Sequence, residues 1–310
     1  MRSSASWISR NHGSLSRGVL VAAAFAAALA LEPPAARAAK QEFDAGLLWR
    51  ISKPGVKDSF VFGTIHLPDP RVNAVPKPVD DALAESRTLA IELVPGAIAD
   101  ARVFDLELLE GGRTLESLIG REALGRVRER LDPQAIPESV LARLKPWAVL
   151  VKLGPTSARD AEQGLDQRLL AVARARRMQV APLELPEEQI AAFDAVPMDS
   201  QVALLKHALD HRDALEGAVA PTIDAWLRGD LAGLARIGDR MGERFPGMDS
   251  HYRELTKHIV HNRTIVMHHR LALPLRGGRV FVAVGAMHLH GSKGLLALLQ
   301  RDGYRVTRIA

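Results

Sequence analysis

The sequence contains no cysteine and only two tyrosines among its 310 residues. The missing cysteine excludes disulfides, thiolate metal ligands, iron–sulfur clusters, a cysteine nucleophile and an N-terminal lipoprotein anchor. The scarcity of aromatic residues, 5% of the chain, argues against base stacking on nucleic acid. The sequence also lacks the G-x-S-x-G, S-x-x-K, Walker and dinucleotide-binding patterns, which disfavours serine hydrolases and nucleotide-dependent enzymes.

The formal charge of +5 is concentrated at the N-terminus. Three arginines precede an unbroken apolar run at residues 18–31, and Ala36-Arg37-Ala38 is a small-x-small cleavage signal. This layout predicts a secretory signal peptide over residues 1–38 and a periplasmic or secreted protein. The mature chain then carries 37 basic and 35 acidic residues, so no nucleic-acid partner is expected. Membrane association is expected only if the N-terminal segment stays uncleaved.

The mature chain, residues 39–310, is predicted to be one α/β domain. Its mixed central sheet is expected to carry a large helical insertion over about residues 97–275. The Pro54-Gly55 turn predicts a hairpin between two apolar runs. Together with that hairpin, the hydrophobic patterns predict the following helices and strands in chain order. These are a hairpin of Leu47–Lys53 and Ser59–Ile65, helix Val79–Arg87, strand Thr88–Leu93, helix Gly164–Arg177, strand Met178–Leu183, helical segments from Glu187 to about Leu273 with a break near Arg244–Met248, strand Arg279–Val284, helix Ser292–Arg301 and strand Tyr304–Ile309.

Two segments share the order strand, G-x-x-H-L, helix, strand. The first contains Gly63 and His66, and the second contains Gly285 and His288. Helical crossovers favour parallel pairing, and ligands bind beyond the carboxyl ends of such strands. We therefore expect two half-repeats that place both histidines at one rim of the sheet.

Two glutamates end other predicted strands: Glu92 follows Leu89-Ala90-Ile91, and Glu184 follows Val180-Ala181-Pro182-Leu183. A carboxylate in an apolar strand requires a cation or a metal, so a buried ion pair with an arginine is the alternative for each. Together with His66 and His288 they predict a divalent-metal site. Imidazole and carboxylate ligands without thiolate suit Mn, Co, Fe or Zn.

The segment Arg253–Leu273 is predicted to be a helix whose apolar stripe contains Leu255, Ile259 and Val266. Asn262 falls on this stripe at helical spacing and Arg263 borders it, so both are candidates for orienting a substrate or stabilising an oxyanion. Elsewhere, His207 and His211 lie one helical turn apart but lack the glutamate of a zinc-protease motif. A solvated helix face is expected for these two histidines.

Nearly the whole mature chain resembles the TraB/PrgY/GumN family, whose relatives include the Tiki metalloproteases. The matching pieces are LLWRISKPG…SFVFGTIHLPD, IELVP, Gly164-Leu165-Asp166, the LE…EEQ stretch at Leu183–Gln189, Asn262-Arg263 and VAVGAMHLHGSKGLLALLQRDGYRV. Leu185 departs from the threonine that the family often has after the glutamate. The resemblance implies a fold shared with haem-binding ChaN-like and erythromycin-esterase-like (EreA) proteins.

The resemblance also implies a metal site centred on the two motif histidines and the glutamate. We therefore expect an exported, divalent-metal-dependent hydrolase that acts on a peptide or on another amide or ester. In this hypothesis His66, His288 and Glu92 hold the metal, and Glu184 or Glu92 acts as ligand or general base. The alternatives are a non-catalytic protein that binds a metal, haem or a peptide, and an accessory protein of polysaccharide export.

Overall fold

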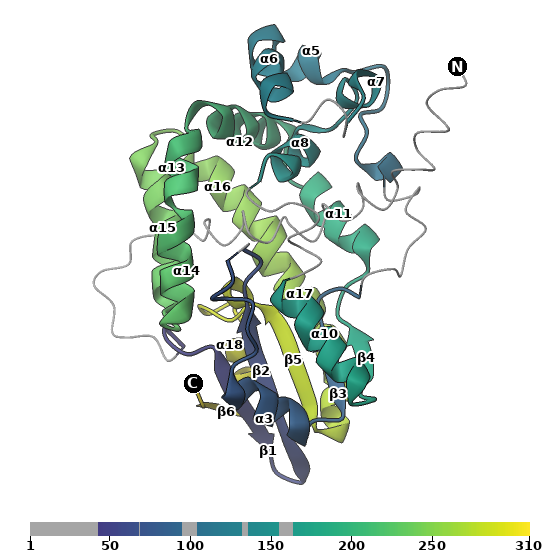
Figure 1. Ribbon diagram of the computed structural model, residues 1–310, viewed down its shortest axis with the longest axis vertical. Helices are drawn as coiled ribbons and strands as arrows, with labels where there is room; N and C mark the ends of the chain where they lie inside the picture. The colour runs from purple at the N-terminus through teal and green to yellow at the C-terminus, as the bar shows by residue number, and fades with distance from the viewer. Residues whose placement is uncertain (1–42, 68, 95–103, 132–135, 155–163) are drawn as a thin grey trace.

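A computed structural model describes residues 43–310 except for 68, 95–103, 132–135 and 155–163 (Figure 1). The predicted signal peptide therefore lies outside the described residues. Six strands form one sheet in the order β4-β3-β5-β2-β1-β6. They are β1 (Leu48–Lys53), β2 (Val56–Thr64), β3 (Thr88–Ile91), β4 (Gln179–Pro182), β5 (Val280–Gly285) and β6 (Arg305–Arg308). None of the described helices is long and apolar enough to cross a membrane.

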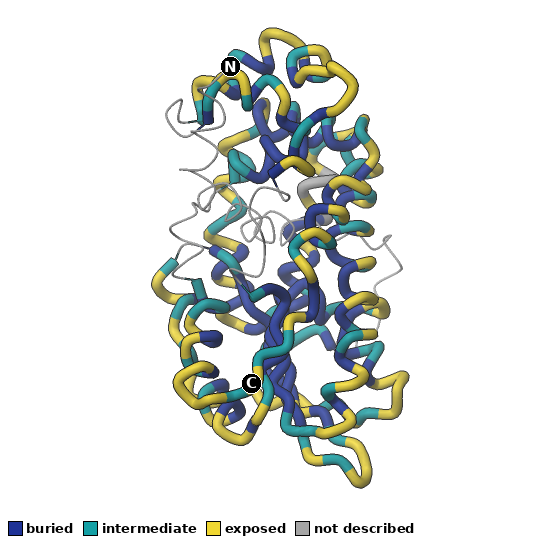
Figure 2. Tube along the Cα trace, turned by 90° about the vertical axis from the view of Figure 1, so that its right-hand side faces the viewer, coloured by how far each residue is buried: buried dark blue, intermediate teal, exposed yellow. Residues whose placement is uncertain are grey.

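The sheet is mixed, which confirms the predicted α/β class. Strands β4, β3, β5 and β2 run parallel, while β1 pairs antiparallel with both β2 and β6. The Pro54-Gly55 turn joins β1 to β2 as predicted, and Gly55 takes a positive φ of 77°. Every residue of β5 is buried, because parallel strands are covered on both faces. Figure 2 shows buried chain in the interior and more exposed loops around it. The edge strands β4 and β6 are more exposed than the central ones.

Most of the chain between β3 and β5 is helical, and many of these helices occupy the upper part of the molecule in Figure 1. The predicted break near Arg244–Met248 is present between α15 and α16. The helices are α3 (Lys77–Glu85), α5 (Leu115–Ile119), α6 (Arg121–Arg130), α7 (Glu138–Leu141), α8 (Pro146–Lys152), α10 (Leu165–Ala175), α11 (Pro186–Asp194), α12 (Met198–Asp210), α13 (Arg212–Gly217), α14 (Val219–Leu227), α15 (Leu231–Arg244), α16 (Asp249–Thr256), α17 (Arg263–Gly277) and α18 (Leu295–Arg301).

A π-helical turn, η2 (Lys257–Asn262), joins α16 to α17 and changes which residues face the core. Leu255 and Ile259 are buried as predicted, but Val266 is 39% exposed and Asn262 is exposed. Arg263 and Met267 are buried instead. The wider π-helical turn accommodates extra residues and shifts the helical phase, so the stripe predicted from regular α-helical spacing was wrong beyond Ile259.

The two half-repeats are not confirmed, although both G-x-x-H segments follow neighbouring parallel strands. The register pairs Gly63 with Val284 and Thr64 with Gly285, so the two glycines are offset by one position. The strand after the first copy, β3, pairs with β5 inside the sheet, whereas β6 pairs with β1 at the opposite edge. A short 3-10 helix, η3 (Ala286–His288), also carries the second histidine.

The expectation of a solvated face was wrong for His207. This side chain is buried, and its ring lies 4.5 Å from the ring of Phe245 and 5.7 Å from that of Tyr252, centroid to centroid. Packing between α12 and α16 encloses the ring. Burial lowers the pKa of His207 to about 4.

Candidate metal and catalytic site

Glu92 and Glu184 lie side by side just beyond the carboxyl ends of β3 and β4. The backbone N–H of Leu183 donates to the carbonyl of Ile91, and that of Glu184 donates to the carbonyl of Glu92. The parallel ladder thus continues past the strands and aligns the two glutamates. Both side chains are buried. Two adjacent buried carboxylates require a cation.

Arg263, the first residue of α17, supplies that cation. Its Nη2 donates to Glu92 Oε2 at 2.8 Å and to Glu184 Oε2 at 2.5 Å, and its Nε donates to Glu184 Oε1 at 2.9 Å. Its Nη1 donates to the carbonyl of Ile259 at 3.1 Å. The buried ion pair that sequence analysis left open for each glutamate is therefore present, and one arginine serves both.

The remaining oxygen of Glu92 faces the rim of the sheet. Glu92 Oε1 accepts a hydrogen bond from the backbone N–H of Gly285 at 2.5 Å and lies 3.7 Å from His288 Nε2. Burial disfavours the ionised carboxyl, but Arg263 and the neighbouring histidines outweigh it and lower the pKa of Glu92 to about 2. Glu92 thus keeps its negative charge inside the protein.

Hydrogen bonding sets the tautomer of His288. Thr264 Oγ1 donates its single proton to the carbonyl of Val260 at 2.7 Å, so it accepts the bond that joins it to His288 Nδ1 at 2.8 Å. Nδ1 therefore carries a proton, and Nε2 keeps its lone pair toward Glu92. Burial lowers the pKa of His288 to about 4, which keeps the ring neutral near pH 7.

His66 is oriented in the same way by a carboxylate. Its Nδ1 lies 2.8 Å from Asp166 Oδ2, at the first turn of α10. Burial alone favours the neutral ring, but Asp166 outweighs it and raises the pKa of His66 to about 9. A carboxylate on Nδ1 leaves Nε2 to face the rim, which is the usual arrangement behind a metal-binding histidine.

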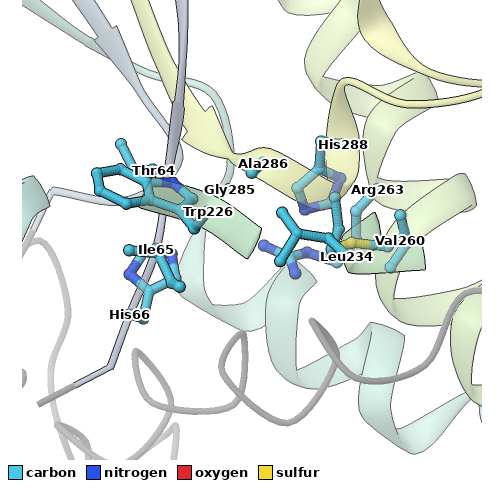
Figure 3. Close-up of a pocket in the computed structure, with 11 residues that line it drawn as sticks. Thr64, Ile65, His66, Trp226, Leu234, Val260, Arg263, Gly285, Ala286 and His288 are labelled. Carbon is cyan, nitrogen blue, oxygen red and sulfur yellow. The ribbon is translucent and has the colours of Figure 1, made fainter. Parts of the chain in front are cut away.

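Gly285 keeps open the space where these side chains converge. A Cβ at this position would lie 3.3 Å from Glu92 Oε1, 3.6 Å from His288 Cδ2 and 3.8 Å from His66 Nε2. Beside this point is a cavity of about 30 Å³ that both histidines and Arg263 line. Figure 3 shows His66 on one side of the view, with His288 and Arg263 on the other.

The predicted site residues thus fall into two groups. His66, Glu92 and His288 surround one point, and Glu184 joins them through Arg263. Asn262 lies apart from this group: it is exposed, and its Nδ2 lies 3.5 Å from His258 Nδ1. The phase shift of the π-helical turn turns Asn262 outward and Arg263 inward.

Sequence reasoning missed the partners that orient the two histidines. Asp166 belongs to the Gly164-Leu165-Asp166 segment at a helix start, so a signal for it was present. Thr264 had no such signal, because a threonine inside a predicted helix does not by itself indicate a functional role. The cavity-lining Trp226 and Leu234 come from α14 and α15, far from the motifs in sequence.

The donor set suits a divalent ion in part. Two imidazole nitrogens and a carboxylate oxygen are ligands that borderline divalent metals prefer. In the described part of the chain, however, no three such side chains are arranged as a ready metal-binding group. Glu184 is already held by Arg263 through both oxygens, so His66, His288 and Glu92 are the residues that could hold an ion.

Comparison with known proteins gives a family assignment. The model of the TraB/PrgY/gumN family matches residues 47–308. The chain belongs to this family. As a TraB/PrgY/gumN member it is 26% identical over 257 residues to the uncharacterised proteins YbaP of Shigella flexneri and Escherichia coli (strain K12), a match that covers 81% of this chain and 90% of each relative.

A more distant relative has a named activity. The chain is 24% identical to the metalloprotease TIKI2 of Danio rerio over 314 aligned positions, which cover 84% of this chain and 60% of TIKI2. No solved structure matches the chain significantly. Family membership and this relative suggest a hydrolase and a divalent metal.

Proposed function

We propose that this protein is an exported, divalent-metal-dependent hydrolase that cleaves a peptide or another amide or ester bond. The observation that carries the proposal is the shared orientation of His66 and His288. Nδ1 of His66 forms an ion-pair contact with Asp166, and Nδ1 of His288 is hydrogen-bonded to Thr264. The opposite side of each ring lies beside the position of a Cβ on Gly285. The activity named for TIKI2 supports the same function.

His66, His288 and Glu92 would hold the ion through Nε2, Nε2 and Oε1. When bound, a divalent ion at this place would polarise the substrate carbonyl and lower the pKa of a water molecule. Asp166 and Thr264 keep the imidazoles in the orientation that this role requires. The export and the peptide or small-molecule substrate rest on the N-terminal sequence pattern and on the family.

Glu184 is the candidate proton acceptor. Glu92 faces His288, whereas Glu184 lies behind it and shares Arg263. Burial raises the pKa of Glu184, while the pKa of Glu92 is low, so Glu184 is the stronger base of the two. Arg263 acts as a positioning residue, since its bonds to both glutamates and to Ile259 hold the pair in place.

The cavity beside the two histidines measures about 30 Å³. Such a volume accommodates groups of roughly the size of two water molecules. The site therefore suits an ion and a small part of a substrate.

The test combines metal analysis with turnover. Purified mature protein should bind Mn²⁺, Co²⁺ or Zn²⁺ with a stoichiometry of one and cleave members of a peptide library in its presence. His66→Ala and His288→Ala should lose both properties, and the control His268→Ala, whose ring binds Asp302 at the surface, should keep both. Full metal retention in both site variants would overturn the assignment.

A further inference from the structure

One buried hydroxyl in the cavity takes no part in the proposed hydrolysis. Thr64, the last residue of β2, is 1% exposed and lines the cavity. Among the residues that the structure describes, its Oγ1 has no hydrogen-bond partner. A buried hydroxyl without a partner costs about 1–3 kcal/mol, so a bound group that accepts its proton would be stabilised there.

The register of the sheet places this hydroxyl at the site. Thr64 pairs with Gly285 in the parallel ladder of β2 and β5, and paired residues project from the same face of a sheet. A Cβ on Gly285 would point at Glu92, His288 and His66. The Thr64 side chain therefore rises from the sheet next to the proposed metal ligands.

The wall facing these groups is apolar and comes mainly from the helical region. Trp226 of α14 and Leu234 of α15 line the cavity with Val260 and Met287, and all four are buried. The Trp226 indole is fixed, because its Nε1 donates to the carbonyl of Gly63 at 3.0 Å. In Figure 3 Trp226 lies on the same side of the view as His66, and Leu234 lies near His288 and Arg263. This wall offers no partner for a charged or long polar group.

We propose that the cavity is a subsite for a small, uncharged acyl group, such as acetyl. The acyl oxygen accepts a hydrogen bond from Thr64, and the short alkyl part contacts Leu234 and Trp226. This inference rests on the proposed hydrolase function. Hydrolysis breaks the bond from the acyl carbon to nitrogen or oxygen; water supplies a hydroxyl to the acyl carbon and a proton to the leaving group.

Cavity volume selects the short acyl chain. A cavity of about 30 Å³ has room for only a small group beside Thr64. An additional methylene that a pocket cannot accommodate typically lowers kcat/KM by about 10-fold or more. Removing the Leu234 side chain would lengthen the subsite without touching the histidines or glutamates.

Turnover of acetyl, butyryl and octanoyl amides of 7-amino-4-methylcoumarin, measured with the metal-loaded protein, tests the chain length. The wild type should prefer acetyl over butyryl by about 10-fold in kcat/KM, and Leu234→Ala should erase that preference. Thr64→Val should lower kcat/KM for the acetyl amide about 10-fold, and Thr64→Ser should restore it. The control Leu227→Ala, on the exposed side of α14, should match the wild type.

Ligand-observed NMR with acetamide and hexanamide separates this inference from the proposed function, because it requires no turnover. Acetamide should give saturation transfer with the wild type and Thr64→Ser but not with Thr64→Val. Hexanamide should give saturation transfer only with Leu234→Ala. If the wild type fails to cleave any amide yet shows this pattern, the subsite stands and the hydrolase does not. Equal binding of both amides to the wild type, or an unchanged ranking in Leu234→Ala, would overturn the subsite.

Discussion

The backbone N–H of Glu184 donates to the carbonyl oxygen of Glu92, which extends the β3–β4 ladder beyond the last strand residues. Two carboxylates are thereby held next to each other in the interior. Arg263 reaches both from a different part of the chain and neutralises part of their charge.

Arg263→Met should destabilise the protein by about 3–5 kcal/mol, because it leaves two buried carboxylates without a cation. The matched control is Arg270→Met in the same helix, where the Arg270–Glu188 pair is about one third exposed and should be worth about 1 kcal/mol or less. Urea unfolding measures both free energies. Equal losses in the two variants would contradict a special role for Arg263.

The two glutamates should differ in their effect on metal binding. Glu92→Gln should abolish binding or weaken it at least about 100-fold, because it removes a proposed ligand. Glu184→Gln should retain the metal but lose most turnover, since this residue is proposed to accept a proton. Isothermal titration calorimetry and kcat on the best substrate separate these outcomes. Loss of metal in Glu184→Gln would contradict this division of roles and indicate that Glu184 is a metal ligand.

Asp166→Ala should weaken metal binding about 10–100-fold, because His66 loses the carboxylate that orients its ring. Asp302→Ala provides a matched control: Asp302 also binds a histidine at 2.8 Å, but His268 lies at the surface away from the cavity. Calorimetric titration with Mn²⁺ compares the two variants. An unchanged affinity in Asp166→Ala would show that packing alone orients His66.

Metal affinity should depend on pH through His66. Near neutral pH the metal-free protein carries His66 protonated, with its pKa at about 9, while His288 is neutral and Glu92 is ionised. Binding therefore displaces one proton, and the Mn²⁺ affinity should rise about 10-fold per pH unit between pH 6.5 and 8.5. Calorimetry in two buffers of different ionisation enthalpy counts that proton. If no proton is released on metal binding at pH 7.5, His66 is not a metal ligand.

His207 should make the metal-free protein sensitive to acid. Its pKa is about 4 in the folded state and near 6.5 when unfolded, so the unfolded chain takes up the proton first as the pH falls. The folded protein is therefore unaffected by titration of His207 above about pH 6.5, and its free energy of unfolding falls progressively as the pH drops toward 4. His288 acts in the same direction. His66, whose pKa is raised, acts in the opposite direction near pH 6.5–7, because its stabilisation is complete only below the unfolded pKa of about 6.5.

Urea unfolding at pH 4.5 and pH 7 should therefore show a smaller difference for His207→Leu than for the wild type. His269→Leu, at an exposed position of α17, should leave the difference unchanged. An identical difference in His207→Leu and the wild type would refute the contribution of this ring.

Much of the fold and part of the site were predictable from local patterns. Pro54-Gly55 predicted the first hairpin, and apolar runs predicted the strands. The G-x-x-H segments and the glutamates that follow apolar runs predicted where strands end. Each of these signals lies within a few residues of the feature it predicts. The Glu92 and Glu184 positions also implied a cation, although the sequence offered both a metal and an arginine.

Only the tertiary structure decided which cation each glutamate meets and which helix residues face the site. The π-helical turn, which regular periodicity does not reveal, brings Arg263 inward and leaves Asn262 exposed. Contacts of Asp166, Trp226 and Leu234 with the site depend on chain segments far apart in sequence. The residue types and strand ends were therefore set by local chemistry, whereas the partners of His66, Glu92 and Glu184 were set by long-range packing.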